Sequence, residues 1–85
     1  MKNLLKKCKY KITYITDKNG NPKKDKASLG RLNKIGTADI LSDTLLFFYP
    51  DRLTGFRTSP IESISETDDG VCVETQNTRY SLAYL

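Results

Sequence analysis

Histidine and tryptophan are both missing from this 85-residue chain, which holds only two cysteines and three prolines. Without His there is no base for Ser/His/Asp or Cys/His catalysis, and the commonest zinc ligand is lacking. Two Cys cannot supply a four-thiolate site. We therefore expect no catalytic site, no metal site and no cofactor. We also expect Cys8 and Cys72 to stay reduced.

Glycine-rich phosphate-binding motifs and long apolar runs are also absent. No stretch approaches the ~18 apolar residues of a membrane span, and the first ten residues lack the apolar core of a secretory signal. We expect a cytoplasmic protein without membrane contact. Leu, Ile, Val and Phe make up about a quarter of the chain, above the ~20% below which chains tend to be disordered. This predicts a folded protein with a thin core, divided into a basic N-terminal segment (1–8) and one small β domain (9–85).

Charge is distributed unevenly along the sequence. Residues 1–36 carry eleven Lys and Arg against two Asp, whereas residues 37–85 carry three Arg against eight acidic residues. Such asymmetry indicates an anionic partner for the first half. The alternative is that folding brings the two halves together and neutralises the charge internally.

The N-terminal segment has apolar residues at helical spacing, namely Met1, Leu4, Leu5 and Cys8, with lysines between them. This pattern is typical of a short basic amphipathic helix. An extended lead-in to the first strand is the structural alternative.

Alternating residues predict a strand over residues 9–16, with Tyr10, Ile12 and Tyr14 on its inner face. A tight turn at Asn19-Gly20 should follow. Weaker alternation over Ala27–Ile35 predicts a bent strand that returns beside the first, so that residues 9–16 pair with residues 24–32.

The middle of the chain is less regular. Residues 36–41 fit either a short strand or one helical turn. The apolar run Thr44–Tyr49 predicts a central strand covered on both faces, with Phe47 in the core. A further strand from Leu53 should end at Ser59-Pro60, because proline interrupts ladder pairing.

The last 25 residues predict two hairpins, with turns at Asp69-Gly70 and Asn77-Thr78. The sum is six or seven short strands with closely spaced turns. We therefore expect a mainly β fold, a small antiparallel barrel or bent meander of SH3-like or Sm-like size.

Lysines around the first strand and its turn favour binding to nucleic acid or to a nucleoprotein complex. They would neutralise phosphates, and Tyr10 or Tyr14 would stack on bases. The residues predicted to bind are Lys6, Lys7, Lys9, Tyr10, Lys11, Lys23, Lys24, Lys26, Arg31 and Lys34. Because Lys dominates over Arg, attraction to the backbone is favoured over base-specific readout. The competing interpretation is that these lysines only keep the strands soluble.

A second hypothesis is a protein-binding role for the acidic and aromatic second half. Such a protein would inhibit or bridge a host complex, as an accessory protein of a phage or mobile element does. Its aromatic surface would come from Phe47, Phe48, Tyr49, Phe56, Tyr80 and Tyr84. Its acidic contact residues would be Glu62, Glu66, Asp68, Asp69 and Glu74.

Overall fold

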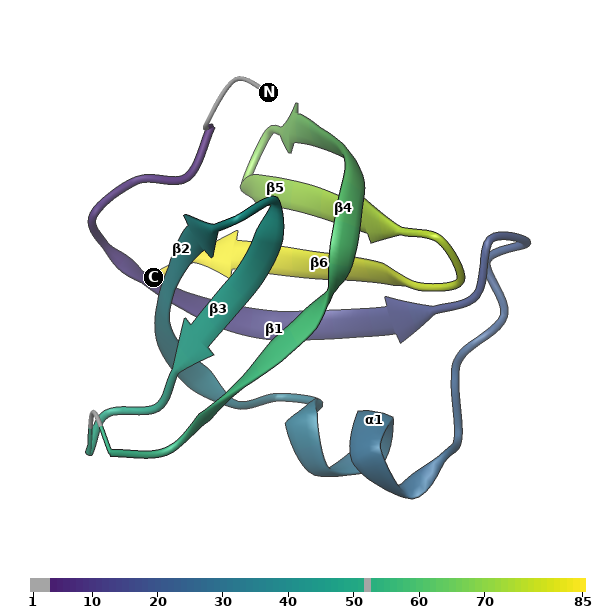
Figure 1. The fold of residues 1–85 in the computed structure, drawn as a ribbon, viewed down its shortest axis with the longest axis horizontal. Coiled ribbons are helices and arrows are strands. Elements are labelled where there is room, and N and C mark those ends of the chain that lie inside the picture. Colours follow the sequence, from purple (N-terminus) through teal and green to yellow (C-terminus); the bar gives the residue numbers. More distant parts are fainter. Residues whose placement is uncertain (1–3, 52) are drawn as a thin grey trace.

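Six antiparallel strands close into a ring in the computed structural model, which describes residues 4–51 and 53–85 (Figure 1). Each strand pairs with the next in sequence, and the last pairs with the first. Because strand direction alternates, an even number of strands lets this closing pair be antiparallel too. The elements are β1 (Lys9–Thr16), α1 (Lys26–Arg31), β2 (Ile35–Leu41), β3 (Thr44–Phe48), β4 (Gly55–Thr67), β5 (Gly70–Thr75) and β6 (Arg79–Tyr84). The predicted small antiparallel barrel is confirmed.

The core fills the inside of this ring. Period-two alternation within each strand sends one set of side chains inward, and these come from β1, β3, β4, β5 and β6. The buried apolar residues are Tyr10, Ile12, Ile15, Leu45, Phe47, Ile61, Val71, Val73, Tyr80 and Leu82. Phe47 stacks on Phe56 with ring centroids 5.4 Å apart, and Phe56 stacks on Tyr80 at 6.1 Å.

The apolar run that forms β3 is covered on one face only, so the prediction of two covered faces is wrong. Leu45 and Phe47 are fully buried, whereas Phe48 is 39% exposed. The reason is architectural: a strand in a single closed sheet has one face in the barrel and the other in solvent. The preceding segment, for which strand and helical turn were both open, is strand β2.

Pro60 does not end its strand, contrary to expectation. β4 runs through it for 13 residues, pairing first with β3 and then with β5. The register shifts on both sides of this changeover, between Thr44 and Leu46 and between Ile61 and Ser63. Proline lacks a ladder donor but is tolerated at bulges, and the pairing places Pro60 where β4 passes from one partner to the next. Figure 1 shows that β4 is strongly bent.

Residues 26–31 form the helix α1, which corrects the predicted bent strand over Ala27–Ile35. Asp25 caps the helix: its carboxylate accepts hydrogen bonds from the Ser28 backbone N–H at 3.1 Å and from the Ser28 hydroxyl at 2.8 Å. The predicted pairing of residues 9–16 with residues 24–32 is therefore wrong. β1 pairs instead with β2 and β6.

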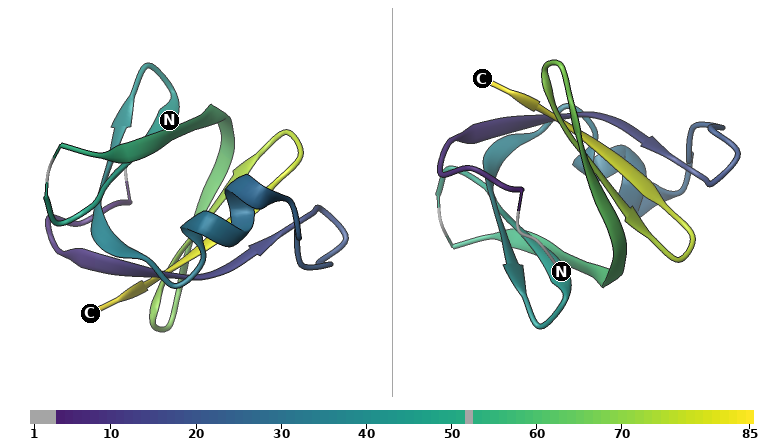
Figure 2. Two further views of the ribbon diagram at one scale, coloured as in Figure 1. Left: turned by 90° about the horizontal axis from the view of Figure 1, so that it is seen from below. Right: turned by 90° about the horizontal axis from the view of Figure 1, so that it is seen from above.

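α1 lies below the barrel in the view of Figure 1, and Figure 2 shows it in front of the strands when seen from below and behind them when seen from above. It is attached by its last turn. The Arg31 guanidinium stacks 4.2 Å from the centroid of the Phe56 ring, and Leu32, just after the helix, packs against the core. The helix therefore forms a wall beside β1 without entering the barrel.

Among the described residues, positions 4–8 form neither the predicted helix nor an extended lead-in: the segment is irregular, with a bend at residues 7–8 and a hydrogen bond from the Cys8 backbone N–H to the Lys6 carbonyl at 2.9 Å. Leu4, Leu5 and Cys8 still pack against the core. The Lys6 backbone N–H donates to the Tyr10 hydroxyl at 2.7 Å. The segment is thus held to the barrel by apolar side chains and by the buried Tyr10 hydroxyl. Residues 1–3 of the predicted helix lie outside the described residues.

The β4–β5 hairpin is confirmed, but its turn is one residue earlier than predicted. Thr67 pairs with Gly70, which places Asp68 and Asp69 at the tip. Gly70 is not in the positive-φ region; it is buried as the first residue of β5, where a Cβ would lie 1.8 Å from the Leu82 carbonyl oxygen. Close approach of β5 to β6, and not turn geometry, requires glycine here.

Candidate functional site

A bulge in β1 determines which tyrosine reaches the surface. Ile12 and Ile15 are both buried although they are three residues apart, and the register against β6 shifts between Ile12 and Tyr14. An extra residue in a strand reverses the faces of the residues beyond it. Tyr14 is therefore 66% exposed, whereas Tyr10 is fully buried. The prediction that Tyr14 lies on the inner face is wrong, and Tyr10 has no free ring face for a base.

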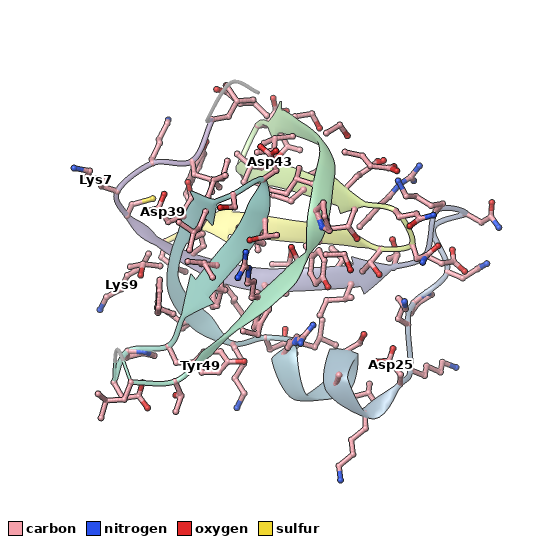
Figure 3. All side chains as sticks on the ribbon, in the orientation of Figure 1. Lys7, Lys9, Asp25, Asp39, Asp43 and Tyr49 are labelled. Atoms are coloured by element: carbon pink, nitrogen blue, oxygen red, sulfur yellow. The ribbon has the colours of Figure 1, made fainter. Side chains whose placement is uncertain are left out.

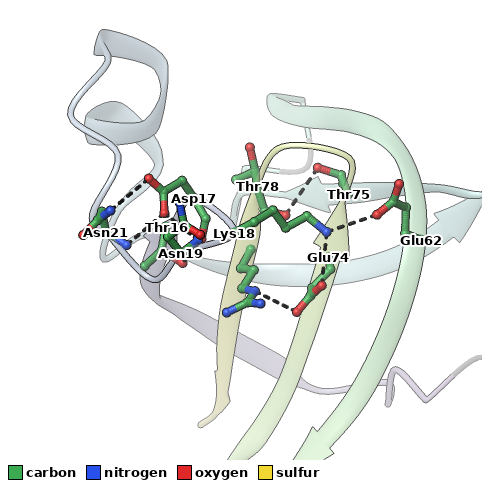
Figure 4. A network of polar contacts seen from close by, with 10 residues as sticks. Thr16, Asp17, Lys18, Asn19, Asn21, Glu62, Glu74, Thr75 and Thr78 are labelled. Atoms are coloured by element: carbon green, nitrogen blue, oxygen red, sulfur yellow. Dashed lines mark hydrogen bonds and ion pairs between the residues drawn. The ribbon is translucent and has the colours of Figure 1, made fainter.

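The loop after β1 is rigidified by an Asx turn and an ion-pair network. The Asp17 carboxylate accepts from the backbone N–H groups of Asn19 at 2.8 Å and Asn21 at 3.0 Å. These hydrogen bonds, that from Asn21 foremost, lower the pKa of Asp17. The next residue, Lys18, reaches away from the loop toward β4 and β5 (Figure 4).

Lys18 joins three separate parts of the chain. Its ammonium lies 3.1 Å from carboxylate oxygens of both Glu62 and Glu74 (Figure 4), and Arg79 lies 2.8 Å from the other oxygen of Glu74. The hydrogen bond from Lys18 is the main cause that lowers the pKa of Glu74. Lys18 thus links the loop after β1 to β4 and β5, and the charges of Glu62 and Glu74 are balanced by Lys18 and Arg79.

After this loop the chain returns along the end of β1. Thr16 and Pro22 form an isolated antiparallel bridge, and the Lys23 backbone N–H donates to the Ile15 carbonyl at 3.0 Å. The Lys23 ammonium donates to the Thr78 hydroxyl at 3.1 Å, and its charge also acts at longer range on the carboxylates of Asp17 and Asp25. Lys24 is exposed.

A hollow with a volume of about 310 Å³ lies between β1 and α1. We call it the Tyr14 groove, and its lining includes Tyr14, Pro22, Lys23, Lys24, Leu29 and Leu32. Leu29 is 55% exposed on the helix side. No acidic side chain lines the groove. Asp17 and Asp25 do not line it, but they lie close enough for Lys23 to lower their pKa values. Their hydrogen bonds also favour the ionised carboxylates, so two negative charges lie near the Lys23 side of the groove.

A second hollow, of about 520 Å³, lies at the opposite end of β1. This N-terminal groove is lined by Leu5, Lys6, Lys7, Lys9, Asp39 and Phe48 among others. It differs from the Tyr14 groove because a carboxylate lines it. The Lys6 ammonium also lies over the Tyr84 ring, 4.7 Å from its centroid.

The predicted binding lysines do not come together as expected. Lys7 and Lys9 lie at one end of β1, and the segment of Lys23, Lys24 and Asp25 lies at the other (Figure 3). The expected hairpin does not form, so nothing folds the second group back onto the first. Lys11 and Lys34 lie between them, next to the β1–β2 pairing, and Arg31 packs on Phe56.

The lysines predicted to bind make no ion pairs in the described part of the chain. In the described part of the chain, only Lys18 and Arg79 supply the cations of ion pairs. None of the Lys or Arg residues predicted to bind is paired with a carboxylate there. The internal neutralisation considered from the sequence is therefore confined to the Lys18 network.

The acidic second half offers less surface than predicted. Phe47 is fully buried and Tyr80 is 6% exposed, so neither can belong to an exposed aromatic surface. Glu62 and Glu74 are ion-paired. Glu62 and Phe48 are still exposed, and the exposed acidic residues of this set that make no ion pair in the described chain are Glu66, Asp68 and Asp69 at the hairpin tip.

Within residues 4–51 and 53–85, no three His, Cys, Asp or Glu side chains are grouped so that they could hold a metal ion. No helix in these ranges is long and apolar enough to span a membrane. Burial raises the pKa of the Cys72 thiol, which keeps it protonated and weakly nucleophilic near neutral pH.

Sequence reasoning missed the wall of the Tyr14 groove formed by α1. Two local signals point to it in retrospect. Asp25 is a residue type favoured at helix N-caps, and Ile12 and Ile15, which are three apart within one strand, can both be buried only if the strand contains a bulge.

Acid should loosen α1 through its cap. Hydrogen bonds from Ser28 lower the pKa of Asp25 from its ordinary value of 3.8. The folded state therefore prefers the ionised carboxylate, and this stabilisation is present above pH 3.8 and is lost as pH falls through the lower folded pKa. We expect the Ser28 amide NMR signal to titrate below the ordinary Asp range. Asp25→Asn keeps the cap without the charge and should abolish this titration; an amide that titrates at 3.8 would contradict the cap.

The chain matches no protein-family model, no curated protein and no solved structure, so what it does is inferred from its own fold and surface.

Proposed function

We propose that this protein is a non-catalytic nucleic-acid-binding module whose contact surface is the Tyr14 groove with its lysine rim. One observation carries the proposal: an exposed aromatic side chain, apolar walls and two lysines line one hollow that has no acidic side chain. Lysines attract phosphates, and aromatic rings stack on bases. A nucleic acid offers a counterpart to each feature, because its phosphates carry negative charge and its bases are flat aromatic rings.

Charge comparison favours this groove over the N-terminal groove. The carboxylate of Asp39 lines the N-terminal groove and would repel a phosphate. Lys6 is engaged by the Tyr84 ring. The lysines at that end of β1 then contribute long-range attraction, which salt screens over roughly 10 Å at 0.1 M ionic strength.

Two matched double variants test the location of the site. Lys23→Ala/Lys24→Ala and Lys7→Ala/Lys9→Ala remove the same charge from opposite ends of β1, since β1 begins at Lys9 and the chain at Pro22 and Lys23 pairs with its end. In fluorescence anisotropy titrations with labelled oligonucleotides, we expect the first pair to weaken binding about tenfold or more. We expect it to reduce the log–log salt slope by about one to two. The second pair should weaken binding only about twofold to threefold, because its effect is long-range.

Two results would contradict the proposal. Equal losses in both variants would show that net charge, and not the groove, attracts the nucleic acid. Absence of binding by the unaltered protein at low salt would remove nucleic acid as the ligand. Circular dichroism should be unchanged in both variants, since neither lysine pair makes an ion pair in the described structure.

A further inference from the structure

The Tyr14 groove contains an exposed aromatic ring, that of Tyr14, which a surface that binds phosphate alone does not need. Tyr14 makes no ring contact with any other aromatic residue in the described chain. It is 66% exposed, although its strand belongs to the core of the barrel. A tyrosine that serves packing would bury its ring, so this ring is presented to solvent by the bulge that buries Ile15.

The remaining walls of the groove suit a flat apolar ring. Pro22 and Leu29 line it from the returning chain and from α1, and Leu32 lines it beyond the helix. The volume of about 310 Å³ is at the lower end of the ~300–1,000 Å³ typical of ligand pockets. It accommodates a single nucleobase and its sugar and not a longer stacked segment.

Polar and charged residues line the groove beside its apolar residues. Thr13, Thr16 and Asn33 also line it. The Thr13 and Thr16 hydroxyls donate to the carbonyls of Ser81 and Asp17, so toward a base they can act as acceptors, and the Asn33 amide can donate or accept. Lys23 and Lys24 line it on the side of the returning chain, where they can meet the phosphates that flank an inserted base. A base therefore finds a stacking partner and polar edges, and the backbone finds cations.

We propose that the Tyr14 groove binds one unpaired base by stacking on Tyr14, so that the ligand is single-stranded; this inference rests on the proposed nucleic-acid binding. In a duplex both faces of each base are already stacked, and a protein reads the base edges with an element inserted into a groove. α1 is only six residues long, and its last residue, Arg31, is packed on Phe56. Bases that are not stacked in a duplex are free to leave the strand and meet an aromatic side chain.

The test compares a labelled single-stranded oligothymidylate with the duplex it forms with oligoadenylate, using anisotropy. We expect tighter binding of the single strand. Tyr14→Ser should weaken single-strand binding about tenfold or more, whereas Tyr14→Phe, which keeps the ring, should stay within about twofold. An oligonucleotide that carries 2-aminopurine should lose fluorescence on binding to the unaltered protein and to Tyr14→Phe, but not to Tyr14→Ser.

A second variant tests the groove from its opposite wall. Leu29→Glu introduces a negative charge and should weaken single-strand binding without removing the ring; Leu29 is exposed, so the midpoint of unfolding should not change.

Equal binding of duplex and single strand, with Tyr14→Ser unchanged and Lys23→Ala/Lys24→Ala still weakened, would overturn the unpaired-base inference and leave the proposed function standing. Failure of the unaltered protein to bind either oligonucleotide would overturn both.

Discussion

Replacing Phe47 by Ala is expected to lower the free energy of unfolding by about 3–5 kcal/mol, the range found when a buried aromatic side chain is removed from a core. Phe47 is fully buried in β3. It stacks on Phe56 and meets the edge of Tyr49 at a centroid distance of 6.0 Å. The neighbouring strands cannot collapse into the space left behind, because their register is held by hydrogen bonds on both sides of β3.

The adjacent residue provides the matched control. Phe48 is 39% exposed on the outer face of the same strand, so Phe48→Ala should cost about 1 kcal/mol or less. Urea denaturation followed by circular dichroism measures both. A small domain has only about 4–13 kcal/mol of stability, so Phe47→Ala should shift the midpoint strongly or unfold the protein. Similar losses at the two positions would contradict the assignment of their faces.

Gly70→Ala is expected to destabilise the protein by about 2–3 kcal/mol, as inserting atoms into a packed interior does. An added Cβ would lie 1.8 Å from the Leu82 carbonyl oxygen and 2.8 Å from its carbonyl carbon. Both are backbone atoms of β6, which cannot rotate aside as a side chain can. Relief requires β5 to move away from β6 along a pairing that joins Gly70 to Ala83.

Gly30→Ala is the control with the opposite sign. Gly30 lies in α1, and nothing is within 4 Å of the position its Cβ would take. Ala is favoured over Gly in a helix by about 0.5–1 kcal/mol, so this variant should be stabilised. The two substitutions are chemically identical, and their urea midpoints should move in opposite directions. A loss below about 0.5 kcal/mol for Gly70→Ala would show that β5 and β6 approach less closely.

The distribution of charge connects fold and proposed function. The barrel brings Lys18 between Glu62 and Glu74 and leaves the other lysines of the first half without carboxylate partners in the described chain. Ion pairs therefore stabilise the loop that precedes the Tyr14 groove, while the groove keeps its positive charge. A binding surface with uncompensated lysines is expected to be strongly salt-dependent.

Strands could be predicted from the sequence wherever alternation is local. β1 was predicted with its observed bounds, and the final hairpins follow from alternating residues such as Val71 and Val73. α1 was missed because a weak alternation in Leu29–Asn33 masked the capping role of Asp25, which depends on a hydrogen bond to Ser28. The strand break predicted at Pro60 was wrong for a related reason. Proline lacks a backbone N–H, and this ends a strand only where a neighbouring strand would accept a hydrogen bond from that position.

The Tyr14 groove could be predicted only in part. Its lysines are evident from charge, but the exposure of Tyr14 depends on a bulge opposite β6, whose residues are far away in the sequence. The burial of Tyr10, Phe47 and Tyr80 likewise depends on which face of each strand turns inward once the ring closes.

By itself the sequence determined that this protein is a small β fold with a basic first half, because strand alternation and charge are properties of neighbouring residues. Only the tertiary structure decided that β1 pairs with β2 and β6, that the lysines divide between two ends of β1, and that the exposed Tyr14 lines a groove beside α1. These outcomes depend on closing a ring between the first and last strands. Ring closure is a long-range event, and local periodicity carries no information about register across it.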